Sequence, residues 1–180
     1  QMNPHFMFNA IGSVSNLMQS GRVDEAQDSL RKFSRLMRST LEQSQGDDIL
    51  LEDEIDFLEN YLHLEKLILG DNFSFTITVD DSIDVAYERI PSLILQPIVE
   101  NALKHGLRTK QGERKLNISF TLEEDSEQTT MQILIDDNGI GRKASAELNK
   151  DRKQHQSFAT KSIDERIKII NTTAEFEKIT

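Results

Sequence analysis

The apolar residues of this 180-residue chain change their spacing at Gly70. Before Gly70 they recur every three or four positions, as on one face of a helix. The first of these stripes consists of Met7, Ile11, Val14 and Met18. Directly after Gly70 they alternate with polar residues, as in a half-buried strand. This strand pattern consists of Phe73, Phe75, Ile77 and Val79. A helical part followed by a part with strands predicts an α+β fold.

The helical part is predicted to begin with an antiparallel hairpin. Asn3 can cap a helix whose first residue is Pro4, and residues 20–22 interrupt that helix. A second helix is expected from about residue 24, with an apolar stripe at heptad-like spacing. This stripe consists of Ala26, Leu30, Phe33, Met37 and Leu41. Because one hairpin leaves much of its apolar surface uncovered, a homodimeric four-helix bundle is expected.

A polar stretch at residues 45–48 predicts a domain boundary. We therefore expect residues 1–46 to form the helical hairpin domain and residues 47–180 to form a second domain. A third helix is expected at residues 52–69, because the apolar stripe ends there and Gly70 follows it. Pro91 is expected to open the next helix.

Two further strands are expected late in the second domain. Apolar and polar residues alternate at residues 116–122 and again at 131–135, with an acidic turn at 123–128 between them. This arrangement predicts an antiparallel hairpin. Residues 142–156 are polar and carry no strong signal, and a last helix is expected at 160–171.

Composition excludes several classes of function. The net charge of −10 argues against a nucleic-acid partner, because phosphate backbones require clustered basic residues. No apolar run reaches the roughly 18 residues that a membrane-spanning helix needs. The chain has no cysteine, which excludes disulfides, thiolate nucleophiles and cysteine-based zinc sites. It opens on Gln1 within a motif, so a fragment is expected.

The helix expected from Pro91 carries a polar motif beside its apolar face. Asn101 and His105 lie on one flank, and Glu100 and Lys104 lie on the other, four residues apart in each case. An amide oxygen is a suitable ligand for magnesium, and lysine can neutralise a phosphate. Taken alone, this pattern fits a surface helix with a Glu–Lys pair equally well.

A glycine turn follows the last predicted strand. Asp137, Gly139 and Gly141 form an Asp-x-Gly-x-Gly pattern. Glycine lets the backbone approach a ligand, and the carboxylate can accept from an exocyclic amine such as that of adenine. Taken alone, the pattern is a common turn. The order of the helix motif, the hairpin and this turn makes a nucleotide site the better interpretation.

The N-terminal helix presents a histidine. His5 and Asn9 are one turn apart and fall nearly opposite the predicted apolar stripe, so we expect His5 to face outward. A nucleotide site and an exposed imidazole together suggest phosphoryl transfer to histidine.

Taken together, the helix motif and the glycine turn resemble the adenine-nucleotide site of the GHKL ATP-binding superfamily. The rest of residues 1–141 resembles the LytS/YehU-type sensor histidine kinases. The segments that carry this resemblance are Asn3-Pro4-His5-Phe6-Met7-Phe8-Asn9, Leu36-Met37-Arg38, Leu51-Glu52-Asp53-Glu54-Ile55, Tyr61-Leu62 and Ile90-Pro91.

The resemblance implies a GHKL-type α/β sandwich that binds ATP and Mg2+ after the helical hairpin. It implies that His5 is phosphorylated and that Asn9 lies near the transferred phosphoryl group. Asn101 would ligate magnesium, Lys104 and His105 would line the phosphates, and Asp137 would bind the adenine amino group. The cofactor-binding residues implied in total are Asn101, Lys104, His105, Asp137, Gly139 and Gly141.

The resemblance also implies partners and a setting. These are a second copy of the chain and a response regulator receiver domain, including one joined to a LytTR-type output domain. The expected setting is the cytoplasmic portion of a membrane-anchored bacterial sensor kinase, with any membrane contact made by segments outside this chain.

The chain departs from the family pattern in its last part. Residues 157–162 (Ser-Phe-Ala-Thr-Lys-Ser) replace the family's second glycine box, and the chain stops before the family's final strands. We therefore expect weak ATP affinity and a C-terminally truncated domain. Two other classes of function stay open from sequence: an ATP-hydrolysing conformational machine of the same superfamily, and a degenerate kinase-like module for dimerisation and interaction.

Overall fold

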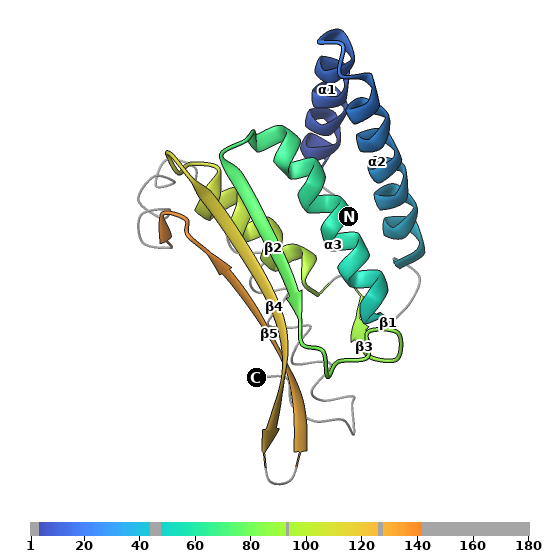
Figure 1. The fold of residues 1–180 in the computed structure, drawn as a ribbon, viewed down its shortest axis with the longest axis vertical. Helices are drawn as coiled ribbons and strands as arrows, with labels where there is room; N and C mark the ends of the chain where they lie inside the picture. The colour runs from blue at the N-terminus through green and yellow to red at the C-terminus, as the bar shows by residue number, and fades with distance from the viewer. Residues whose placement is uncertain (1–3, 44–47, 93, 126–127, 142–180) are drawn as a thin grey trace.

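The first two helices form the predicted antiparallel hairpin (Figure 1). The structure is a computed structural model that describes residues 4–43, 48–92, 94–125 and 128–141. Helix α1 spans Pro4–Gln19 and α2 spans Val23–Gln43. Between them, Gly21 has φ 77°, and its N–H donates to the Met18 carbonyl at 3.1 Å. The N–H of Arg22 donates to the Leu17 carbonyl at 2.9 Å, which completes a Schellman turn.

The predicted apolar stripe of α1 was only partly correct. The buried side chains of α1 are Phe6, Ala10, Val14 and Leu17. Of the predicted stripe, Val14 is buried and Met7 is half-buried, but Ile11 and Met18 are 51% and 56% exposed. Two apolar stripes lie side by side on this helix, and contact with α3 decides which is buried, because the Phe6 ring packs on Tyr61 with centroids 4.8 Å apart.

The stripe predicted for α2 was also only partly correct. Ala26 is buried and Phe33 and Met37 are half-buried, but Leu30 and Leu41 are exposed. Leu36, which the heptad spacing omitted, is fully buried. Both helices therefore carry a second apolar surface that faces away from the rest of the chain.

Helix α3 lies at the centre of the fold and spans Leu51–Leu69. It ends at Gly70, as predicted; Gly70 has φ 82°, and its N–H donates to the Lys66 carbonyl. One core cluster includes Leu58 and Leu62 of α3, Phe73 of the following strand, and Phe6 and Leu36 of the hairpin. Side chains of the hairpin and of the rest of the chain thus share a core.

The described residues form two small sheets, and the larger one follows the predicted alternation. β2 (Phe73–Val79), β4 (Arg114–Asp125) and β5 (Gln128–Asp137) form one sheet in the order β2-β4-β5. β2 runs parallel to β4, and β4 pairs with β5 as the predicted antiparallel hairpin. β1 (Asp48–Leu50) and β3 (Arg89–Pro91) form a second, antiparallel pair that sequence did not predict.

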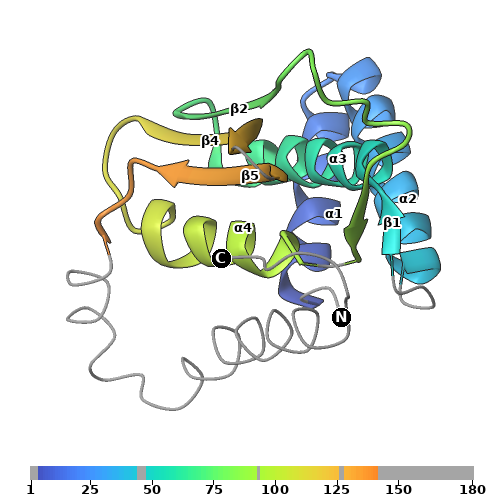
Figure 2. The same ribbon diagram turned by 90° about the horizontal axis from the view of Figure 1, so that it is seen from below.

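The fourth helix starts later than predicted. Pro91 belongs to β3, and helix α4 spans Gln96–Asn101 before continuing as a π-helical turn, η1 (Ala102–Leu107). A proline can start a helix or end an edge strand, and here pairing with β1 decides. Seen from below, α4 lies beneath strands β4 and β5 (Figure 2).

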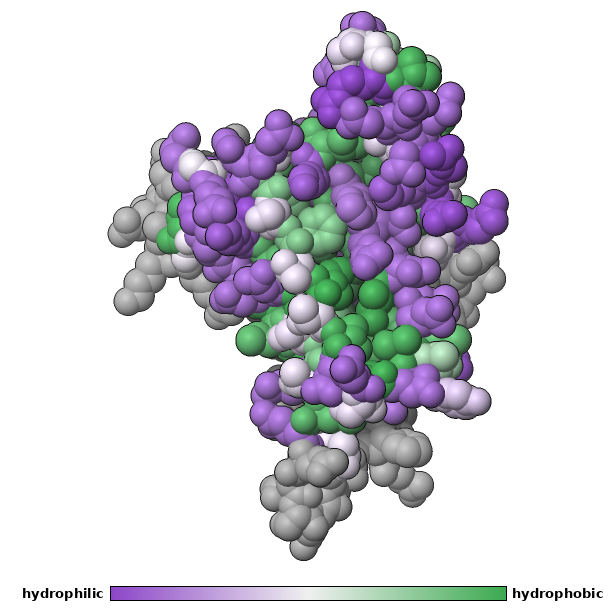
Figure 3. Space-filling view, viewed as in Figure 1, coloured by the Kyte–Doolittle hydropathy of each residue, from purple (hydrophilic) through white to green (hydrophobic). Residues whose placement is uncertain are grey.

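The described part of the chain is therefore a mixed α+β structure, with N-terminal helices followed by small sheets. Figure 3 shows apolar surface gathered over the region of α3 and β2, bordered by polar surface over α1 and α2. Among the residues that the structure describes, no helix is both long and apolar enough to span a membrane. The predicted last helix and the segment 157–162 lie outside the described residues.

Candidate functional site

The helix that carries Asn101 changes its hydrogen-bond pattern part-way along. α4 has Pro97 in its first turn, where a missing N–H costs nothing. At Ala102 the α-helix gives way to η1, and the N–H of Arg108 donates to the Leu103 carbonyl, five residues back, at 2.9 Å. π-helical turns are frequent at functional sites. This one contains residues 104–106 of the predicted motif.

The three predicted residues of this helix lie near the surface. Asn101 and His105 are half-buried, and Lys104 is exposed. Burial, and then the charge of Lys104, lower the pKa of His105. The imidazole of His105 is therefore biased toward its neutral form, which has one donor and one acceptor nitrogen for a ligand.

The glycine turn closes tightly on Asp137. The N–H of Gly139 donates to Asp137 Oδ1 at 2.8 Å, which fixes the carboxylate over the turn. Asn138 is held to β4, because its Oδ1 accepts from the Lys115 N–H at 2.8 Å and its own N–H donates to the Lys115 carbonyl at 3.1 Å. Gly141 has φ 78°, a conformation that favours glycine.

The helix motif and the glycine turn meet at two glycines. A Cβ added to Gly139 would lie 2.5 Å from the backbone of Gly106, and one added to Gly106 would lie 2.5 Å from Asp137 Oδ1. The N–H of Ile140 donates to the Gly106 carbonyl at 3.1 Å. Gly139 is required because its close neighbour is backbone, whereas a Cβ at Gly106 would have to displace the Asp137 carboxylate. The structure thus brings Asp137 and Gly139 against the residue that follows His105.

Asn101 is the last residue of α4, and Lys104 lies in η1, two residues before Gly106. Within the described residues, no hydrogen bond or ion pair joins Asp137 to Asn101, Lys104 or His105, and no group of three or more histidine or acidic side chains is close enough to hold a metal.

His5 and Asn9 are brought together on α1. His5 is exposed and Asn9 is half-buried, and Asn9 Nδ2 lies 3.1 Å from His5 Nδ1 and 3.4 Å from Nε2. This contact agrees with the predicted outward position of His5. On the helix, both residues lie about 115° from the buried stripe that contains Phe6.

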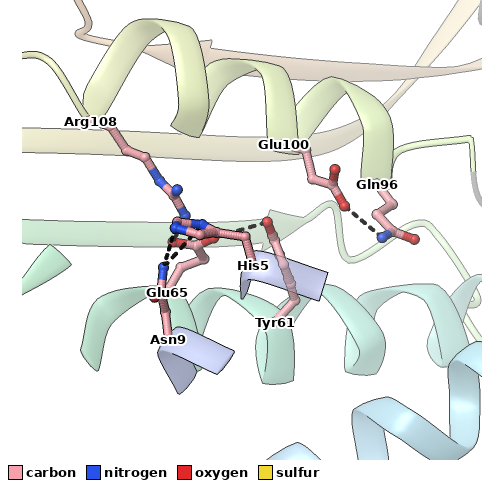
Figure 4. Close-up of polar contacts among 7 residues, drawn as sticks. All are labelled: His5, Asn9, Tyr61, Glu65, Gln96, Glu100 and Arg108. Carbon is pink, nitrogen blue, oxygen red and sulfur yellow. Dashed lines mark hydrogen bonds and ion pairs between the residues drawn. The ribbon is translucent and has the colours of Figure 1, made fainter. Parts of the chain in front are cut away.

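A buried polar cluster, which we call the Glu65 cluster, consists of Tyr61, Glu65 and Arg108 (Figure 4). Arg108 Nη2 donates to Glu65 Oε1 at 2.8 Å and to Oε2 at 3.0 Å, and the Tyr61 hydroxyl donates to Oε1 at 3.1 Å. Burial, and then the charge of Glu65, raise the pKa of Tyr61, so the phenol keeps its proton.

A second pair, Gln96 and Glu100, appears in the same view. Gln96 Nε2 donates to Glu100 Oε1 at 2.7 Å. Burial raises the pKa of Glu100, the Gln96 hydrogen bond lowers it, and the charge of Glu65 raises it again. The Glu100 and Glu65 carboxylates therefore interact across the space between α4 and α3.

Sequence reasoning missed the Glu65 cluster. The available signal was Glu65 itself, an acid four residues after Tyr61 on the apolar stripe of α3. The part played by Arg108 had no signal, because its position depends on the π-helical turn.

Comparison with known proteins adds an independent observation. The family model described as histidine kinase matches residues 1–73. The chain is 35% identical over 143 residues to the sensor protein LytS of Staphylococcus saprophyticus, an alignment that covers 78% of this chain and 23% of that protein. It is 25% identical over 170 residues to the sensor histidine kinase YpdA of Escherichia coli, covering 94% of this chain and 29% of that protein.

The chain belongs to the histidine kinase family. It is also 31% identical over 142 residues to the sensor histidine kinase/phosphatase LytS of Staphylococcus aureus. The chain spans about a quarter of the length of these histidine kinases. The family match contains α1, α2 and α3, and with them His5, Asn9 and Glu65. The YpdA alignment covers enough of the chain to include Asn101 and Asp137.

Proposed function

We propose that this chain is the core of a LytS/YpdA-type sensor histidine kinase in two-component signalling. In this proposal it transfers the γ-phosphoryl group of ATP to His5 and then to an aspartate of a response regulator receiver domain. The observation that carries the proposal is the contact between Gly106 and Gly139, which joins the Asn101 helix to Asp137 in a chain whose first helix exposes His5. The receiver, including one with a LytTR-type output domain, is inferred from the LytS relatives.

We assign the nucleotide site to η1 and the glycine turn. Asp137 accepts from the adenine amino group, and Gly139 and Gly141 let the ligand approach the backbone. Lys104 and His105 face the phosphates. The surrounding region is proposed to be a GHKL-type α/β sandwich within residues 47–180, and the hairpin domain to comprise residues 1–46.

Magnesium fits this site in one specific way. The amide oxygen of Asn101 is a hard ligand, and the described residues offer no cluster of acidic side chains beside it. Mg2+ commonly takes one or two protein ligands and completes its shell with water and substrate phosphates. When bound, the ion would neutralise phosphate charge. We therefore propose that Asn101 is a magnesium ligand only while ATP is present.

Asn9 is proposed to select the reacting nitrogen of His5. If the Asn9 amide donates to Nδ1, the neutral imidazole carries its proton on Nε2. If Asn9 instead accepts from Nδ1–H through its oxygen, the lone pair is on Nε2. We assign the second arrangement to the transfer step. The Nε2–phosphorus bond then forms while the bond from phosphorus to the β,γ-bridging oxygen breaks and ADP leaves.

Transfer requires His5 to approach the γ-phosphate. Phe6, the residue after His5, packs on Tyr61 and lies in the core cluster of α3. Movement of the first turn of α1 toward ATP therefore has to release Phe6 from Tyr61, unless the ATP comes from a second protomer.

A homodimer is part of the proposal. Phe8, Ile11 and Met18 of α1 are exposed, and so are Leu30 and Leu41 of α2. The exposed α1 stripe lies roughly 130° around the helix from His5 and Asn9. A second copy could cover this stripe and leave His5 accessible. In the full-length kinase we expect this region to be cytoplasmic, with any membrane anchor in other segments.

The decisive experiment is labelling with γ-labelled ATP and Mg2+. We expect label on the protein that survives alkali and is lost in acid, as for phosphohistidine. His5→Gln should abolish it, whereas the control His63→Gln, at an exposed position on α3, should not. Equal labelling of the His5 variant would contradict the assignment. Phosphate release without labelling would indicate an ATP-hydrolysing machine, and absence of ATP binding would indicate an interaction module.

A further inference from the structure

Glu65 is the one carboxylate of the Glu65 cluster, and it is only 1% exposed. It accepts three hydrogen bonds, two from Arg108 and one from Tyr61. A buried carboxylate is costly unless it is paired and hydrogen-bonded. The contacts of Glu65 meet that requirement only while η1 and α3 keep their relative positions, since Arg108 follows η1 and Glu65 belongs to α3.

The π-helical turn is what directs Arg108 toward Glu65. In an α-helix, a residue five positions on lies about 140° around the axis. In η1 the Arg108 N–H donates to the carbonyl of Leu103, so Arg108 lies one turn above Leu103 on the same side. Leu103 is 1% exposed and belongs to the core. The extra residue in the turn therefore brings Arg108 to the buried side of the helix.

The opposite side of the same turn contacts the end of β5. The Gly106 carbonyl accepts from the Ile140 N–H, and Gly106 has no room for a Cβ beside Asp137. Lys110, just beyond the turn, donates to the carbonyl of Asn138. A displacement of η1 would therefore move the backbone that supports Asp137.

Tyr61 extends these contacts to the first helix. Its hydroxyl donates to Glu65, and its ring packs against Phe6, which follows His5. The buried carboxylate of Glu65 thus contacts both Arg108, which positions η1, and Tyr61, on which Phe6 at the start of α1 packs.

We propose that Glu65 is a positioning residue that holds η1, through Arg108, in the geometry that presents Asp137, and that supports the first turn of α1 through Tyr61. Its consequences for ATP and His5 rest on the proposed function, whereas its effect on η1 does not. Glu65 contacts neither reacting group in this role.

The first test needs no nucleotide. Amide hydrogen exchange is measured for the Arg108 and Ile140 N–H groups, which report η1 and its contact with the glycine turn. Glu65→Gln is expected to speed exchange at both by at least about tenfold. Glu25→Gln is the matched control, because it makes the same chemical change in an exposed ion pair on α2. Unchanged exchange in Glu65→Gln overturns the proposal.

The second test separates the two sides of the cluster. Glu65→Gln is expected to weaken ATP affinity about tenfold, as measured by calorimetry. Tyr61→Phe keeps Arg108 in place, so it should change ATP affinity less than about twofold while changing the rate of His5 labelling about fivefold, because Tyr61 supports Phe6. Equal loss of ATP affinity in both variants would contradict this division. A parent protein that binds no ATP would refute the proposed function and leave the exchange test valid.

General loss of stability is distinguished with a core variant. Phe120 in β4 is fully buried and makes no hydrogen bond to the Glu65 cluster, and Phe120→Leu is expected to lower the melting temperature. Exchange in both variants is measured at a temperature at which each protein is fully folded. If Phe120→Leu, at an equal loss of melting temperature, speeds Ile140 exchange as much as Glu65→Gln, the positioning role of Glu65 is overturned.

Discussion

Replacing Glu54 by Gln should make the stability of the protein less dependent on pH. Glu54 lies in the first turns of α3 and is 0% exposed. Among the described residues, no group donates a hydrogen bond to either carboxylate oxygen. Burial therefore raises the pKa of Glu54 from 4.5 to about 7, an effect that the nearby Leu95 backbone only partly offsets.

The size of the effect follows from the two protonation states. The folded-state pKa is above the unfolded-state value, so the folded protein binds the proton more tightly. Below pH 4.5 both states are protonated and no stability is lost. Between pH 4.5 and about 7 the unfolded state loses its proton while the buried Glu54 of the folded state keeps it, so the free energy of unfolding falls as the pH rises. At about 1.4 kcal/mol for each pKa unit, this lowers the free energy of unfolding by about 3 kcal/mol by pH 8.

The assay is urea unfolding of the parent and of Glu54→Gln at pH values from 4 to 8. Because the amide never ionises, the free energy of unfolding of the parent minus that of the variant should fall by about 3 kcal/mol across this range. Subtraction removes the titration of groups that both proteins share. Glu52→Gln is the matched control, since it makes the same change on an exposed side chain of the same turn. A difference that is constant with pH, or that rises, would refute the burial of an unpaired carboxylate at Glu54.

Three other substitutions test the site and the assembly. Gly106→Ala places a Cβ 2.5 Å from Asp137 Oδ1, so we expect ATP affinity to fall at least about tenfold in calorimetry, whereas Gly12→Ala, in open space, should bind as the parent does. Asp137→Asn replaces one acceptor oxygen by a donor, and we expect ATP binding to be lost. The melting temperature should change by only a few degrees, because Asp137 is exposed. Unchanged ATP affinity would refute the assignment. Ile11→Glu puts a charge on the exposed α1 stripe and is expected to make any dimer seen in sedimentation at high concentration dissociate; a persistent dimer would mean that another surface associates.

The elements with the strongest local signals were predicted correctly. Gly70 ends α3 because glycine can adopt the positive φ that terminates a helix. The alternation at β4 and β5, with a polar turn between them, led directly to their antiparallel pairing. These features depend on residues that are close in sequence, so a single chain can reveal them.

The predictions were wrong where the local sequence fitted two structures equally well. On α1, the stripe containing Ile11 and the one containing Phe6 are both apolar, and only the contact with Tyr61 selects the second. Pro91 fits the first turn of a helix as well as the end of an edge strand, and pairing with β1 selects the strand. In both cases, a contact between residues far apart in the sequence determines the structure.

For the candidate site, the sequence by itself identified the residue types and their order: an exposed His5 beside Asn9, the helix motif at Asn101, and the glycine turn at Asp137. It could not reveal the contact between Gly106 and Gly139, or the position of Arg108 over Glu65, because both depend on a π-helical turn. A π-helical turn is rare and has no residue pattern of its own. It persists here alongside contacts with α3 on one side and β5 on the other, and those contacts exist only in the folded chain.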